Sequence, residues 1–128
     1  MNHDAKKIVL SPLGHTWILD LDGTIVKHNG YKTDGIDSLL PGVKAFLDSI
    51  PEDDMIIFLT SRSDKYKELT EAFLKDNHIR FHQIIYGAPY GERILLNDCK
   101  PSGLEMGIAI NVKRDVGCDL SLRIDGKL

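Results

Sequence analysis

Cysteine is scarce in this chain, and its scarcity excludes several architectures. The 128 residues include two cysteines, Cys99 and Cys118, which form no C-x-x-C pair and no repeated spacing. Disulfide-stapled domains and zinc ribbons need more cysteines at regular spacing, so neither is expected. Isolated reduced thiols are typical of the cytoplasm, and we predict a cytoplasmic protein.

Long apolar runs and a strong charge of one sign are missing too. Residues 1–15 lack the apolar core of a signal peptide, and no apolar run is long enough to cross a membrane, so we expect no secretion and no membrane partner. The formal net charge of -3 provides no overall basic surface, so nucleic acid is not the expected partner. The length suits a single domain covering residues 1–128.

Strand-like and helix-like patterns alternate along the chain. Apolar residues recur at helical spacing between Val43 and Ile50, after a Pro41 suited to a first helical position, and again between Tyr66 and Leu74. Strands are predicted at residues 16–21, 55–59, 83–86, 94–96 and 108–112, with an ambiguous segment at 120–124. This alternation predicts an α/β fold with a mainly parallel five-stranded sheet. The continuous apolar run at 55–59 predicts a strand buried on both faces.

A glycine-rich segment, residues 23–40, follows the first predicted strand. Asn29-Gly30 is a strong tight-turn signal, and it lies between the apolar pair Ile25-Val26 and Tyr31. We therefore predict a short hairpin that forms a flap beside the end of the strand.

Polar residues end three of the predicted strands. Asp20 and Asp22 lie two residues apart, so they point the same way if the strand continues through them. The other two strands end in Thr60-Ser61 and Asn97-Asp98. Ligands of open α/β sheets bind at the carboxyl ends of the strands, so these side chains should meet in one crevice.

This set of residues suits phosphoryl chemistry. Two carboxylates side by side repel unless a cation lies between them, and Mg²⁺ prefers such oxygen ligands. The metal and a Lys or Arg would neutralise phosphate oxygens in the transition state. One aspartate could attack phosphorus, and another could transfer the proton.

Three segments carry a resemblance to a known family. Residues 20–24, Asp-Leu-Asp-Gly-Thr, resemble the D-x-D-G-T signature of the haloacid dehalogenase-like (HAD) phosphatases. Residues 58–62 resemble the second motif of that family, a strand ending in Thr or Ser, and residues 95–98 resemble its acidic fourth motif. The resemblance covers residues 16–112 and implies a Rossmann-like three-layer fold.

The resemblance implies a role for each strand end. Asp20 would be the nucleophile and a magnesium ligand, and Asp22 the general acid and base with its main-chain carbonyl on the metal. Thr60 would hold a phosphoryl oxygen with the help of the Ser61 main chain. Asp98 would be a further metal ligand.

The basic residue opposite the phosphate departs from the family pattern. The family has a Lys or Arg at the start of a helix. Here residues 87–93 leave little room for a helix, and their only basic residue is Arg93. Lys100 lies in a Lys-Pro-Ser-Gly turn that resembles the turn supplying this lysine in some small members. We favour Lys100 as the catalytic and phosphate-binding residue, with Arg93 and Arg62 as alternatives.

The chain resembles the capless members of the family. Short intervals follow Thr24 and Thr60, which leaves no room for a cap domain. Capless members have open sites, and either act on large substrates or self-associate so that a neighbour covers the site. The resemblance therefore implies a dimer or tetramer. Its implied activity is magnesium-dependent hydrolysis of a small phosphate monoester, such as a sugar phosphate, through an aspartyl-phosphate.

Three alternatives stay open. One is a phosphatase for nucleotides or for polynucleotide ends, although the lack of net basic charge argues against a polynucleotide. The second is a phospho-acceptor domain of the receiver type, but Asp22, two residues after Asp20, favours turnover over stable phosphorylation. The third is an inactive regulatory relative, although Asp20, Asp22 and Asp98 are all present.

Overall fold

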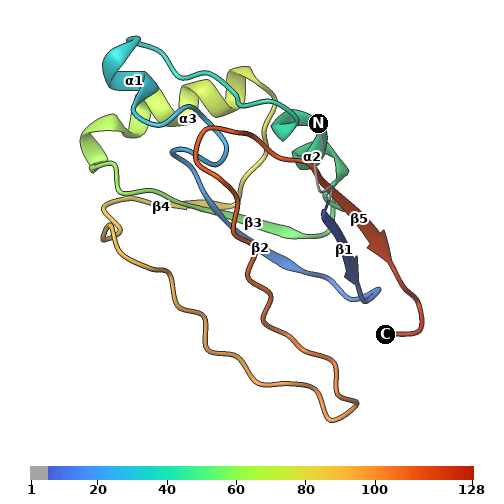
Figure 1. The fold of residues 1–128 in the computed structure, drawn as a ribbon. Coiled ribbons are helices and arrows are strands. Elements are labelled where there is room, and N and C mark those ends of the chain that lie inside the picture. Colours follow the sequence, from blue (N-terminus) through green and yellow to red (C-terminus); the bar gives the residue numbers. More distant parts are fainter. Residues whose placement is uncertain (1–5) are drawn as a thin grey trace.

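Three parallel strands with aligned ends form the sheet that carries the predicted site. The computed structural model describes residues 6–128. The register sets Asp20 beside Leu59, and Leu59 beside Ile85. The strands predicted at 16–21, 55–59 and 83–86 are confirmed, and the first and third are shorter by one residue. In spatial order the sheet contains β2 (Thr16–Asp20), β3 (Met55–Leu59) and β4 (Gln83–Ile85) (Figure 1).

A second sheet holds the two ends of the described chain. It pairs β1 (Lys6–Leu10) with β5 (Leu120–Ile124) in parallel, so the ambiguous segment at 120–124 is a strand. The protein is a mixed α/β protein, as predicted, but the single five-stranded sheet is wrong. Over residues 6–128 there is one sheet of three strands and one of two.

The predicted strands at 94–96 and 108–112 are not strands in the structure. They lie in an extended arm, residues 91–112, that leaves the sheet and returns (Figure 1). At its tip the main-chain N–H of Lys100 donates to the carbonyl of Leu104 at 2.9 Å. Only residues 86–93 separate β4 from position 94, whereas a parallel crossover needs about a dozen residues or more. The connection is too short to return the chain to the start of the sheet.

Three short helices complete the described fold. They are α1 (Gly30–Thr33), α2 (Val43–Ser49) and α3 (Lys67–Asp76), the last preceded by a 3₁₀ turn at Asp64–Tyr66. The predicted hairpin is wrong, because α1 occupies its place, with Asn29 exposed and Gly30 buried. The helix expected from Pro41 begins at Val43. No helix described within residues 6–128 has the length and apolar character needed to cross a membrane.

The helices pack on one face of the three-stranded sheet (Figure 1). In β3 the side chains of Ile56 and Phe58 point to that face and are buried with Val43 and Leu74. The opposite face carries Ile18, which is 50% exposed, and other apolar side chains of β3 and β4. The prediction that β3 is buried on both faces is therefore wrong, because burial alternates along it.

Candidate functional site

Asp20 is the accessible acid at the end of β2. Its side chain is 38% exposed, and its Oδ2 accepts a hydrogen bond of 2.9 Å from the Thr24 hydroxyl. The turn that follows is fixed by main-chain bonds, including Gly23 N–H to the Val26 carbonyl at 2.7 Å. Gly23 has φ +85°, a conformation that favours glycine. The Asp-x-Asp-Gly-Thr segment thus forms a tight turn that presents Asp20 to solvent.

Asp22 is held by donors from the end of β3. Its Oδ1 accepts hydrogen bonds from Arg62 Nη2 at 2.8 Å and Nε at 3.1 Å. Its Oδ2 accepts from the Thr60 hydroxyl at 2.9 Å. This bidentate ion pair fixes the plane of the Asp22 carboxylate.

Arg62 extends this contact into a buried polar network. Its side chain is 1% exposed and also donates to Asp37, at 2.7 and 3.0 Å, and to the Thr70 hydroxyl at 2.9 Å. The guanidinium lies 3.9 Å from the ring centre of Tyr31 in α1. Burial lowers the pKa of Arg62, but the hydrogen bonds to Asp37 and Asp22 outweigh it and raise that pKa overall. Arg62 is therefore a permanent charge that ties residues 23–40 to the end of β3.

Thr60 and Ser61 follow β3 directly. Thr60 is fully buried, and its hydroxyl donates to Asp22 while accepting the Arg62 main-chain N–H at 3.1 Å. Both functions of the hydroxyl are thus used inside the protein, where they orient Asp22. Ser61 is partly buried beside them.

The predicted basic residues lie at different distances from the acids. Arg93, at the base of the arm, has Nη1 3.5 Å from Asp20 Oδ1, at the long limit for a hydrogen bond. Arg62 pairs with Asp22, whereas Lys100 lies in the turn at the tip of the arm. The structure thus sets Arg93 closest to Asp20, although the sequence pattern favoured Lys100.

Asp98 lies in the arm as well, and its side chain contacts Asn97. Asp20, Asp22 and Thr60 therefore come together in this chain, but Asp98 does not join them. Within residues 6–128, no three His, Cys, Asp or Glu side chains are grouped to hold a metal.

The loop before β5 covers the turn after Asp20, which the sequence interpretation missed. The Asp115 N–H donates to the Gly23 carbonyl at 2.8 Å, and Asp115 Oδ1 accepts the His28 N–H at 2.7 Å. The Arg114 side chain lies against Gly23, where an added Cβ would meet its Cγ at 3.0 Å. The signal was available, because polar residues follow the predicted strand at 108–112 just as they follow the other strands.

The oxygen atoms at the end of β2 fit a hard divalent cation. Mg²⁺ commonly binds through one or two carboxylates, with water and substrate phosphate completing its shell. The Asp20 carboxylate and the Asp22 main-chain carbonyl are the groups that would hold it. The Asp22 carboxylate is already engaged by Arg62 and Thr60.

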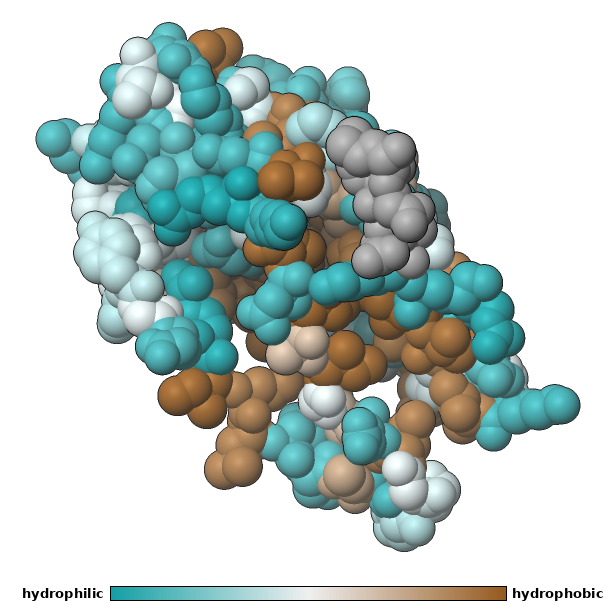
Figure 2. All heavy atoms as spheres, in the orientation of Figure 1, coloured by the Kyte–Doolittle hydropathy of each residue, from teal (hydrophilic) through white to brown (hydrophobic). Residues whose placement is uncertain are grey.

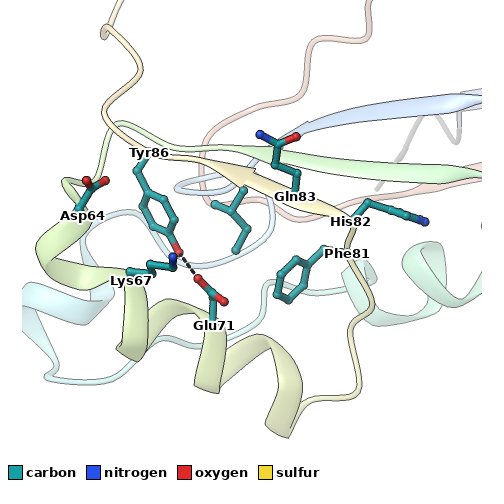
Figure 3. Close-up of a pocket in the computed structure, with 8 residues that line it drawn as sticks. Asp64, Lys67, Glu71, Phe81, His82, Gln83 and Tyr86 are labelled. Carbon is teal, nitrogen blue, oxygen red and sulfur yellow. Dashed lines mark hydrogen bonds between the residues drawn. The ribbon is translucent and has the colours of Figure 1, made fainter.

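A cavity of about 350 Å³ lies apart from these acids, between α3 and β4 (Figure 3). The Tyr86 hydroxyl points to Glu71 across it and donates a hydrogen bond of 3.3 Å. Burial and the Glu71 carboxylate raise the pKa of Tyr86 to about 12, so the phenol stays protonated. We find no group here that extends the chemistry of Asp20.

Comparison with known proteins gives a partial structural likeness. No protein-family model and no curated protein matches the chain. A chain of the solved Pnkp1/Rnl/Hen1 complex is 28% identical, with a TM-score of 0.50, and the match covers 65% of this chain and 31% of that one. A chain of the Pnkp1/Rnl/Hen1 RNA repair complex is 26% identical, also at 0.50, covering 73% and 32%. This chain therefore spans about a third of the length of those neighbours.

Proposed function

We propose that this protein is a phosphoric monoester hydrolase in which Asp20 is the nucleophile. The observation that carries the proposal is the pair of acids after β2. Asp20 is accessible, while Asp22, two residues later, is held in a fixed orientation by Arg62 and Thr60. An exposed carboxylate beside a second, oriented one suits attack and proton transfer at a single phosphate.

The reaction divides into two displacements at phosphorus. An oxygen of Asp20 attacks phosphorus and the bond to the leaving oxygen breaks. Asp22 gives a proton to that oxygen, which requires the Asp22 carboxyl to be protonated and to release one of its contacts with Arg62 or Thr60. Water, losing its proton to Asp22, then attacks the aspartyl-phosphate and releases phosphate. Arg93, 3.5 Å from Asp20, would offset charge on the phosphoryl oxygens. A bound Mg²⁺ would supply further positive charge beside Asp20.

Two substrate classes fit this open site. The family resemblance favours a sugar phosphate or a related small metabolite. The structural neighbours favour a phosphate at the end of a nucleic-acid strand, because both belong to the Pnkp1/Rnl/Hen1 assembly and one is described as an RNA repair complex. Arg93 beside Asp20 and Arg114 over Gly23 are two arginines near the site that could contact the phosphates of such a strand. A strand end is therefore the second candidate.

The test is phosphate release from sugar phosphates, nucleotides and phosphorylated oligonucleotides, with Mg²⁺ or with chelator. We expect release that requires Mg²⁺ and falls about a thousandfold or more in Asp20→Asn. Asp76→Asn, an exposed aspartate in α3, is the matched control and should keep full activity. Stable phosphorylation of Asp20 without turnover would favour a phospho-acceptor. No reaction with any substrate would favour the inactive relative.

A further inference from the structure

The β2 edge and one face of the three-stranded sheet are open. β2 is an edge strand of this sheet in the described chain, so its outer main-chain groups have no ladder partner there. Ile18, on the face away from the helices, is half exposed. Parallel sheets normally have both faces covered, and an open edge is a template for a further strand.

The arm carries exposed apolar side chains that could cover this open face. Ile94 is 92% exposed and Leu96 is 97% exposed. Figure 2 shows hydrophobic residues along the arm, interspersed with hydrophilic ones, away from the helical side of the molecule. Neighbouring apolar side chains that are almost fully exposed are typical of a surface that binds a protein.

Within its own chain, the arm cannot lie along this edge parallel to β2. Its first leg, residues 91–99, starts at the carboxyl side of the sheet and runs back toward the side where β2 begins (Figure 1). The leg therefore runs opposite to β2 of its own chain and leads away from the carboxyl end of that strand, where Asp20 lies. Residues 86–93 are too short for the crossover that would reverse the leg.

A second copy removes this obstacle. A twofold axis perpendicular to the strands reverses their direction in the partner, so a leg that opposes its own β2 runs parallel to the β2 of the second copy. Residue 98 then falls at the carboxyl end of that strand. If Asp98 lies beside Asp20, alternation sets Ile94 and Leu96 on the face that bears Ile18. The open apolar face and the exposed apolar arm then cover one another.

We infer that two copies of this chain exchange their arms. Residues 94–98 of each chain pair with the open edge of β2 in the other, and Asp98 arrives beside Asp20 and Asp22 of that chain. The three aspartates would thus form a site shared by two chains, which a single chain lacks within residues 6–128. The role of Asp98 as an added cation ligand rests on the proposed phosphatase function, whereas the exchange itself does not.

The exchange is tested first by disulfide formation between chains. One chain carries Ile18→Cys and the other Leu96→Cys, both with Cys99→Ser and Cys118→Ser, and their lengths differ so that mass identifies each product. Neighbouring strands bring Cα atoms to the separation that a disulfide needs. We expect a disulfide-linked heterodimer on oxidation. Replacing Ile18→Cys by Leu69→Cys, on the helical side, should give none.

Two results would overturn the exchange. One is the absence of any link between Ile18→Cys and Leu96→Cys chains. The other is an intramolecular link in a dilute chain that carries both cysteines, which would show that the arm returns to its own strand. Disulfide formation needs neither metal nor activity. If the wild-type protein is inactive but the cysteine variants still form the link, only the proposed function is contradicted.

The shared site is tested by mixing two inactive variants. The Asp20→Asn chain still carries Asp98 in its arm, and the Asp98→Asn chain still carries Asp20 at the end of β2. Random pairing makes half of the dimers mixed, each with one complete site, so about a quarter of the wild-type rate should return. If the wild type is active and the mixture stays inactive although the disulfide forms, the arm docks without contributing Asp98 to the site.

Discussion

Arg62 is the buried residue that holds the candidate site in place. It joins Asp22, Asp37 and Thr70, and its guanidinium lies under the Tyr31 ring. A single buried cation thus connects β3, α1 and the Asp-x-Asp turn. Its planar fork suits this task because it can pair with two carboxylates at once.

Replacing Arg62 should destabilise the fold as well as the site. Arg62→Ala leaves Asp22 and Asp37 without their cation, and we expect the free energy of unfolding to fall by about 3–5 kcal/mol. Arg62→Lys keeps the charge but cannot form the bidentate hydrogen bonds, so its effect should be smaller. Urea unfolding measures both. Arg123→Ala, an exposed arginine, is the control and should change stability by about 0.5 kcal/mol or less.

Asp54 should make the stability sensitive to acid. Burial raises the pKa of this carboxyl, but hydrogen bonds from Trp17 and His15 outweigh burial and lower it overall. A carboxyl with a lowered pKa in the folded state stabilises the fold at neutral pH, and this contribution is lost as pH falls below about 4.

The measurement is urea unfolding of the wild type and Asp54→Asn from neutral to acid pH. Asp54→Asn should be less stable than the wild type at neutral pH, and the two should converge in acid. Asp53→Asn, at an exposed neighbour, should follow the wild-type curve. A constant difference between wild type and Asp54→Asn at every pH would contradict the assignment.

At the scale of elements, the loop before β5 and the start of α2 approach main chain to main chain. The Cys118 N–H donates to the Pro41 carbonyl at 2.9 Å. Gly117 has φ +99°, and a Cβ there would overlap the Pro41 carbonyl oxygen. Only glycine permits this approach, which fixes the loop that covers Gly23.

Gly117→Ala should therefore cost more than backbone strain alone. Gly35, with φ +75° and open space around it, is the matched control. We expect Gly35→Ala to cost about 1–2 kcal/mol from the left-handed conformation, and Gly117→Ala clearly more. Equal destabilisation of the two variants in thermal unfolding would mean that the loop moves away from Pro41 freely.

How far sequence reasoning reached depended on whether each signal was local. The apolar run before Asp20 and that at 55–59 predicted their strands, because a short apolar run ending in polar residues is a local pattern. Asn29-Gly30 predicted a turn, but α1 formed there. The helix brings Tyr31 onto Arg62, a contact with a distant segment that no local pattern contains.

The prediction of the site was also limited to what local sequence patterns contain. Asp20, Asp22 and Thr60 were expected together, and the structure brings them together. Asp37 was missed because nothing in its neighbourhood reveals that Arg62 will lie against it. Strands at 94–96 and 108–112 were predicted from their apolar residues, but the short connection after β4 decided their place in the chain, since topology outweighs propensity.

For the whole molecule, the core and the arm are independent parts. The core draws on residues from Trp17 to Ile84 and on Cys118, Leu120 and Leu122, and within the described chain it includes no residue of the arm at 91–112. The side-chain hydrogen bonds between arm and body are exposed, such as that from the Lys6 ammonium to the Asn111 carbonyl at 3.0 Å. Exposed contacts of this kind contribute little to stability.

Replacing residues 92–111 by a flexible Gly/Ser linker should therefore leave the body folded. The replacement removes exposed polar interactions such as the pair of Arg93 with Asp20, which should lower the free energy of unfolding by about 1 kcal/mol or less. The midpoint of thermal unfolding should then shift by only about 2–6 °C. The comparison belongs at a dilution where both proteins are monomers, because an exchanged arm would add stability to the wild type by association. A collapse of the unfolding transition would mean that the arm is part of the fold of its own chain.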